Sequence, residues 1–95
     1  DSTNAYGYFY LGKAHHLLGR YQESLNFLEV AESLFSKESY WLAEIFAFKG
    51  ENFRALGLAE RANSSYTQAL RLNPGNRVAF EGLGRTKEEA PALQR

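Results

Sequence analysis

The sequence predicts an all-α fold, a short curved solenoid of about five helices in antiparallel pairs. Three observations lead to this prediction. Apolar residues recur at spacings of three and four along most of the chain, which is the period of one face of an amphipathic helix. Two long stretches of the chain match each other at a constant offset. Glycine occurs at matching positions of the two stretches, both at predicted breaks between helices and inside helices.

The helices are expected in two repeats and a capping helix. The first repeat, about residues 5–42, and the second, about 43–76, each hold two helices. A break at Gly57 divides the second repeat. The stretch Asn73-Pro74-Gly75-Asn76 stops its second helix, because proline lacks an N–H and disfavours α geometry in the residue before it. A capping helix, about residues 77–90, is ended by Pro91. The predicted helices run from about Thr3 to Leu18, Tyr21 to Phe35, Tyr40 to Leu56, Leu58 to Leu72 and Arg77 to Ala90.

The amino-acid composition of the chain excludes several classes of protein function. The 95 residues form one small domain, residues 1–95, and 44% of them are hydrophobic. The zero formal net charge argues against nucleic-acid binding, which needs clustered Lys and Arg. The chain has no Cys, so disulfides and thiolate sites are excluded, and the compartment stays open with the cytoplasm as the default. No apolar run spans a membrane, so no membrane association is expected. The absence of any Met suggests an excerpt of a larger protein.

The internal repeat is visible in the glycines. The stretch 8–34 matches the stretch 46–72 at an offset of 38 residues, and a partial third copy follows the second by 34. Glycines at the helix breaks suit the positive φ of a helix C-terminus. Glycine inside a helix costs about 1 kcal/mol relative to Ala, so its repeated use there predicts close approach of the paired helix at Ala31 and Ala69. The glycines are Gly19 and Gly57 at the breaks, and Gly12, Gly50 and Gly84 inside helices.

The same periodicity predicts a core. Its members share one apolar face per helix. We expect Tyr8, Leu11, Ala14, Leu18, Tyr21, Leu25, Leu28, Ala31, Leu34, Phe46, Phe53, Ala62, Tyr66, Ala69, Leu70, Phe80 and Leu83 to be buried.

These positions resemble the tetratricopeptide repeat family, a helix-turn-helix unit of about 34 residues. The first copy departs from the family pattern at Ser36, where proline is usual, and it is four residues longer. The matches in the second copy are Phe46, Gly50, Phe53, Gly57, Ala62, Tyr66, Ala69, Leu70 and Pro74. The first copy matches at Tyr8, Leu11, Gly12, Gly19, Tyr21 and Ala31, and the third at Phe80, Leu83 and Gly84.

The resemblance implies a right-handed superhelix whose concave face is lined by the first helix of each unit and binds a peptide. Its N-terminal end is expected to be apolar and aromatic and its C-terminal end net acidic. The groove residues carried over are Tyr6, Phe9, Lys13, His16, Leu17, Glu44, Glu51, Arg54, Glu81 and Arg85. Some family members bind the C-terminal carboxylate of heat-shock chaperones through a Lys/Asn/Arg clamp. That clamp is not expected here, because Phe9 and Ala47 replace polar residues and Glu51 has the wrong sign.

Two functions stay open. The first is a non-catalytic interaction module that binds a peptide or partner protein in the groove. The alternative is a scaffold that self-associates through exposed end helices, with Tyr6 and Tyr10 on the first. An enzyme is not expected, since no nucleophile, base or cofactor motif is present. No cofactor or metal is expected either, because adjacent His15 and His16 point about 100° apart on a helix.

Overall fold

The computed structural model describes residues 4–93, and for residues 90–93 it describes the backbone alone. Within this range the chain is built of α-helices and contains no strand, so the all-α prediction is confirmed. The five helices are α1 (Ala5–Leu17), α2 (Tyr21–Phe35), α3 (Ser39–Ala55), α4 (Ala59–Leu72) and α5 (Arg77–Leu93).

Most helix ends lie within one or two residues of their predicted positions. The helix α1 begins at Ala5 because Asn4 is its N-cap, with Oδ1 accepting from the Gly7 N–H at 3.2 Å. The predicted start at Thr3 lies outside the described residues. The prediction that Pro91 ends the last helix is wrong, since α5 continues to Leu93. The φ to which the proline ring is restricted is compatible with α geometry, although the residue has no N–H to donate.

The two turns inside the helix pairs have the same geometry. Gly19 and Gly57 both have φ +78°. In the first turn the Gly19 N–H donates to the His16 carbonyl at 3.0 Å and the Arg20 N–H to that of His15 at 2.8 Å; the second turn repeats these bonds at 3.0 and 2.8 Å. This is the Schellman pattern, which requires a residue with positive φ after the helix. The predicted role of both glycines is confirmed.

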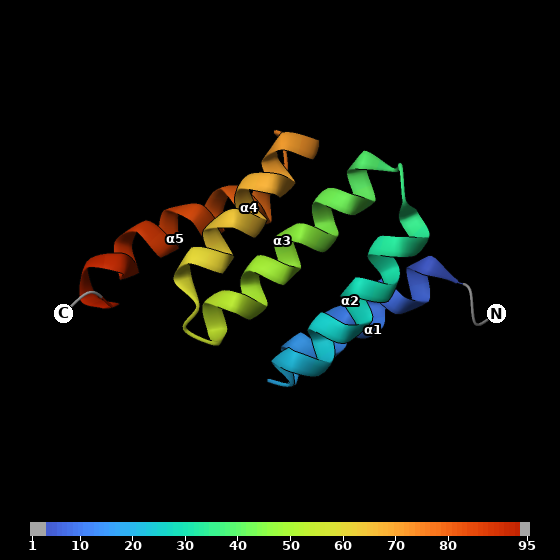
Figure 1. Ribbon diagram of the computed structural model, residues 1–95, viewed down its shortest axis with the longest axis horizontal. Coiled ribbons are helices and arrows are strands. Elements are labelled where there is room, and N and C mark those ends of the chain that lie inside the picture. Colours follow the sequence, from blue (N-terminus) through green and yellow to red (C-terminus); the bar gives the residue numbers. More distant parts are fainter. Residues whose placement is uncertain (1–3, 94–95) are drawn as a thin grey trace.

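The helices form an elongated array (Figure 1). Each helix packs against the next one in the sequence, and α3 also contacts α1 and α5. The array measures 47 by 27 by 16 Å. Because contacts run between neighbours and through the central α3, the arrangement is that of an all-α helical repeat.

The interior consists of two clusters that meet at α3. The first joins α1, α2 and α3 through Phe9, Leu28, Ala31, Phe35 and Ile45. The second joins α3, α4 and α5 and is built mostly of alanine around one large ring; its members are Ala43, Ala47, Ala62, Tyr66, Ala69 and Ala79. Small residues allow the helix axes to approach closely, and the Tyr66 ring fills the space left between them.

Close approach explains two of the three internal glycines. A Cβ on Gly12 would lie 2.7 Å from Leu28 Cδ2, and one on Gly50 would lie 2.5 Å from Tyr66 Cε1. The nearest groups are therefore large side chains and not the predicted Ala31 and Ala69. For Gly84 the prediction is wrong, since nothing lies within 4 Å of an added Cβ. Gly82, two residues earlier, instead packs against the Tyr66 ring.

The predicted core is correct at its centre and wrong at its edges. Leu25, Leu28, Ala31, Ala62, Tyr66 and Ala69 are buried, while Leu11, Ala14, Leu18, Leu34 and Phe80 are exposed. The exposed residues lie on faces that no described helix covers. The remaining predicted members are half-buried. Buried residues that were not among the predicted core are Phe9, Phe35, Ala43, Ile45, Ala47 and Ala79 and the polar Ser24, Asn52 and Thr86.

Candidate functional site

The N-terminal part of the predicted groove is aromatic. Tyr6 is 46% exposed, and its ring makes edge-to-face contacts with Phe35 at 5.2 Å and Trp41 at 5.1 Å between centroids. Phe9 is only 2% exposed and packs against Trp41 and Phe48. It therefore supports this surface from beneath. Trp41 and Phe48 belong to this surface although neither is among the predicted groove residues.

Lys13 lies among aromatic rings. Its Nζ is 5.2 Å from the centroid of Phe48 and 5.8 Å from those of Phe9 and Tyr10. Within the part of the chain that the structure describes, no carboxylate forms an ion pair with it. The rings attract the ammonium through their negative faces, so the cation is held in place with its charge uncompensated.

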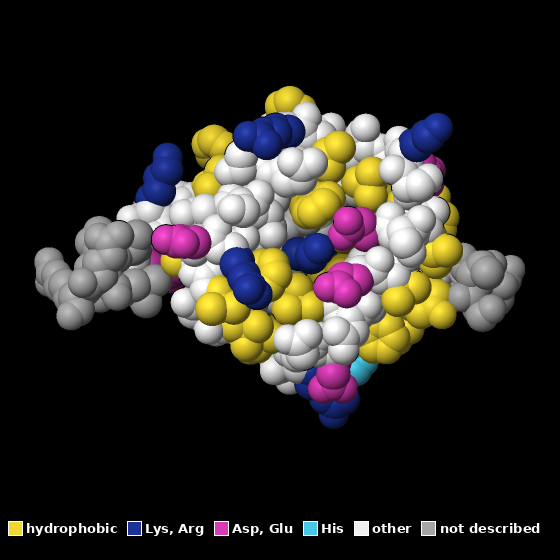
Figure 2. Space-filling model, in the orientation of Figure 1, with side chains coloured by type: hydrophobic (Ala, Val, Ile, Leu, Met, Phe, Trp, Pro, Cys, Tyr) yellow, Lys and Arg dark blue, Asp and Glu magenta, His cyan; other side chains and the backbone are white. Residues whose placement is uncertain are grey.

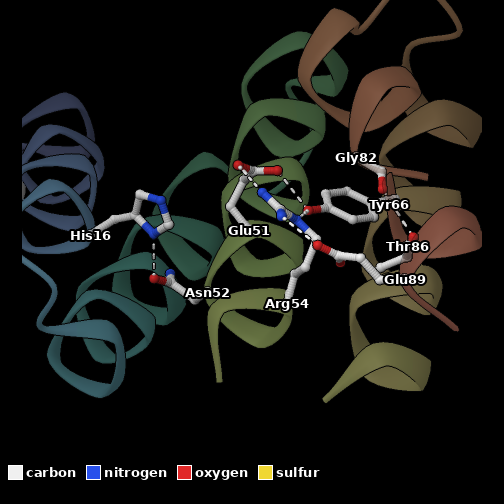
Figure 3. Close-up of polar contacts among 8 residues, drawn as sticks. All are labelled: His16, Glu51, Asn52, Arg54, Tyr66, Gly82, Thr86 and Glu89. Carbon is white, nitrogen blue, oxygen red and sulfur yellow. Dashed lines mark hydrogen bonds and ion pairs between the residues drawn. The ribbon is translucent and has the colours of Figure 1, made fainter. Parts of the chain in front are cut away.

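His16 follows one turn later on α1 and is tied to α3. Its Nδ1 lies 2.8 Å from Oδ1 of the buried Asn52, as Figure 3 shows. Asn52 Nδ2 donates to Ser24 Oγ at 2.8 Å, and Ser24 Oγ donates to the Gly12 carbonyl at 2.6 Å. This chain of bonds joins α1, α2 and α3. Leu17, the next predicted groove residue, is 79% exposed.

The central part of the predicted groove is a closed polar network (Figure 3). The Tyr66 hydroxyl donates to Glu51 Oε1 at 2.6 Å, and Arg54 Nε donates to the Tyr66 oxygen at 3.3 Å. Arg54 also contacts Glu51 at 3.3 Å and Glu89 at 3.5 Å. The guanidinium is thus balanced by two carboxylates, and we expect it to serve the packing of α3, α4 and α5 more than a ligand.

The polar network raises the pKa of two of its members, Tyr66 and Arg54. Burial, together with the hydrogen bond to Glu51, raises the pKa of Tyr66 well above its usual 10.0. Burial alone would lower the pKa of Arg54, but the hydrogen bond to Tyr66 and the charge of Glu51 outweigh it and raise that pKa. Tyr66 is therefore a neutral donor and Arg54 a permanent cation at physiological pH.

The other predicted groove residues lie apart from these groups. Glu44 is half-buried on α3, and Glu81 and Arg85 are exposed on α5. Glu81 borders a shallow depression of about 420 Å³ at the start of α5, together with Pro74, Gly75, Asn76, Arg77 and Phe80. Figure 2 shows charged side chains of both signs among hydrophobic ones on its face of the molecule, so that face carries no large field of one sign.

Two further findings concern the described residues. None of their helices is long and apolar enough to cross a membrane. They contain no group of three His, Cys, Asp or Glu side chains placed to hold a metal ion.

Fold and site together define a helical-repeat protein with an aromatic and cationic surface at one end. No family model matches the chain. Over 83 residues it is 28% identical to a TPR repeat-containing protein of Methanocaldococcus jannaschii. The match covers 87% of this chain and 14% of that relative, so the chain spans a small part of its length. This distant similarity supports a tetratricopeptide-like repeat, as inferred from the sequence, and nothing more specific.

Proposed function

We propose that the chain is a non-catalytic interaction module that binds a peptide segment of a partner protein along α1, α3 and α5. The contact of α3 with both α1 and α5 carries this proposal, because it makes one continuous surface of the three helices. Distant similarity to a repeat-containing protein supports the same class of function.

The chemistry of the surface indicates the kind of peptide. Exposed Tyr6, Tyr10 and Leu17 share helix α1 with the uncompensated ammonium of Lys13, which lies 5.8 Å from the centroid of the Tyr10 ring. Aromatic and aliphatic groups bury apolar side chains of a partner, and the ammonium attracts a carboxylate. The peptide that fits this end of the surface therefore combines apolar side chains with an acidic group.

Selection of peptides from a random display library on the immobilised domain tests the proposal. We expect the selected peptides to be apolar and acidic. They should lose affinity about 1.4- to fivefold for Lys13→Gln, since exposed ion pairs contribute about 0.2–1 kcal/mol. The matched control is Lys37→Gln, which removes the same charge from the exposed loop between α2 and α3. Equal affinity for Lys13→Gln and wild type would place the binding site elsewhere.

A second function, scaffolding by self-association, is favoured by an exposed apolar face of α1 that shares Tyr10 and Leu17 with the proposed peptide-binding surface. This face carries Tyr10, Leu11, Ala14, Leu17 and Leu18, all exposed and uncharged; Leu17 is 79% and Leu18 66% exposed. On α3 the equivalent positions, 38 residues later, include Lys49 and Asn52, which bond to Glu32 and Ser24 of α2. The part of this face that is covered in the second repeat is therefore open in the first, while Ala55 and Leu56, the equivalents of Leu17 and Leu18, are exposed like them.

Sedimentation at increasing protein concentration separates the two functions. Self-association through α1 predicts a dimer that Leu18→Glu disrupts, because it would bury a charge in an apolar contact. A domain that stays monomeric up to the highest soluble concentration would exclude the scaffold.

A further inference from the structure

The hydrogen-bond chain beneath His16 has only one consistent assignment of protons. It begins at the Gly12 carbonyl, which can only accept. Because Ser24 Oγ lies 2.6 Å from that oxygen, the hydroxyl hydrogen must point to it. The Ser24 oxygen is then left as an acceptor for the next group. Ser24 and Asn52 are both fully buried, so water does not offer alternative partners.

The hydrogen position on Ser24 determines the orientation of the Asn52 amide, and the amide determines which nitrogen of His16 carries a hydrogen. The group of Asn52 that lies 2.8 Å from Ser24 Oγ must donate, so it is the amide nitrogen Nδ2. The amide oxygen Oδ1 therefore faces His16 Nδ1 at 2.8 Å. An amide oxygen only accepts, so Nδ1 carries the hydrogen. A neutral imidazole with its hydrogen on Nδ1 has a lone pair on Nε2.

The second nitrogen of His16 is available to a ligand. Among the described residues Nε2 has no hydrogen-bond partner, and it is not one of the buried unpaired atoms, whereas His15 Nδ1 is. Figure 3 shows the ring with its Nδ1 edge toward Asn52 and the other nitrogen turned away from it. The ring also contacts Phe48 at 6.0 Å and Tyr21 at 5.4 Å between centroids, which limits its rotation.

We propose that Nε2 of His16 is a fixed hydrogen-bond acceptor on the binding surface and receives an N–H or O–H group of the bound peptide. Asn52 and Ser24 are positioning residues that select the tautomer. The inference deepens the proposed function and rests on it for the identity of the ligand. Lys13, one turn away on α1, repels a cationic donor, so a backbone amide, a carboxamide or a hydroxyl fits best.

The tautomer is tested in the free domain, without any ligand. Long-range proton–nitrogen NMR spectra at a pH where His16 is neutral report which ring nitrogen carries the hydrogen. We expect the Nδ1–H form in wild type and a mixture of both forms in Asn52→Ala, whose folding is checked by circular dichroism. The Nε2–H form in wild type would overturn the proposal.

The use of Nε2 is tested with a peptide selected on the wild-type domain. His16→Phe, which keeps a planar ring, should weaken binding about two- to tenfold, the value of one neutral hydrogen bond. His16→Gln, which keeps an acceptor, should retain more affinity than His16→Phe. The donor on the peptide is found by methylating its backbone nitrogens one at a time and by removing its side-chain donors one at a time. One of these changes should weaken binding to the wild-type domain and leave binding to His16→Phe unchanged.

The two failures are distinguishable. Equal affinity of wild type and His16→Phe for the peptide would overturn the acceptor role while the peptide-binding function stands. A library that yields no peptide would contradict the peptide-binding function, and the acceptor role with it, whatever tautomer the spectra show.

Discussion

Two glycines of α5 give a sharp test of the packing around Tyr66. Gly82 and Gly84 lie on the same helix, two residues apart. A Cβ on Gly82 would overlap the Tyr66 ring, whereas nothing lies within 4 Å of one on Gly84. The ring has little room to move away from Gly82, because it also packs against Gly50, where an added Cβ would lie 2.5 Å from Tyr66 Cε1. The hydroxyl is also held by Glu51 at 2.6 Å.

Two contributions determine how each substitution changes the free energy of unfolding, helix propensity and overpacking of the core. Replacing glycine by alanine inside a helix stabilises it by about 1 kcal/mol, and this term is common to both substitutions. Overpacking a rigid core destabilises the fold by about 1–3 kcal/mol, and only Gly82→Ala introduces this destabilisation. Gly84→Ala should therefore raise the free energy of unfolding by about 1 kcal/mol. Gly82→Ala should lie about 1–3 kcal/mol below Gly84→Ala, which corresponds to roughly 5–20 °C in Tm for a domain of this size.

Thermal and urea denaturation followed by circular dichroism measure the difference. The same pair of substitutions is then made with Tyr66→Leu, where the ring is absent and the overpacking term should disappear. Equal stability of Gly82→Ala and Gly84→Ala with Tyr66 present would refute the reasoning. A gap that survives Tyr66→Leu would show that it does not come from the ring.

Three other predictions concern polar groups. Tyr66→Phe should lower the free energy of unfolding by about 1–3 kcal/mol in urea denaturation, because it removes the hydroxyl that donates to Glu51 and accepts from Arg54; an unchanged midpoint would contradict this. The raised pKa of Tyr66 stabilises the fold below pH 10 and this stabilisation is lost as the pH rises further, so wild type should lose stability above pH 10 more steeply than Tyr66→Phe. Asn76 Oδ1 accepts from the Ala79 N–H at 2.9 Å at the start of α5, so Asn76→Ala should cost about 1 kcal/mol in thermal denaturation while Asn76→Asp restores most of it; equal loss in both would rule out the capping role.

The helices and turns could be predicted from the sequence because their signals are local. The ends of α2 agree with the prediction, and Gly19 and Gly57 mark turns that need positive φ. Burial depends on distant elements and was harder to predict. The spacing of Leu18 and Phe80 shows an apolar face, yet periodicity does not tell whether another helix covers that face, and both are exposed.

The burial of polar residues in the site was equally hard to predict from the sequence, because it depends on partners that are distant along the chain. Asn52 is fully buried because Ser24 and His16 lie within hydrogen-bond distance, and neither partner is close to it in sequence. Composition treats such a residue as a surface residue. Lys13 was assigned to the groove by resemblance, and its place over Phe48 adds a physical reason for its position.

The last turns of α3 serve both halves of the molecule. Asn52 points to the hydrogen-bond chain of α1 and α2, whereas Glu51 and Arg54 hold Tyr66 of α4 and Glu89 of α5 (Figure 3). Helices α1 and α2 make no contact with α4 or α5 within the described residues, so α3 joins the two halves, and its last turns contact both. A rotation of α3 about its axis displaces both sets of hydrogen bonds together. The contacts that hold Tyr66 and Glu89 and the hydrogen bond that orients the His16 imidazole therefore depend on the same helix.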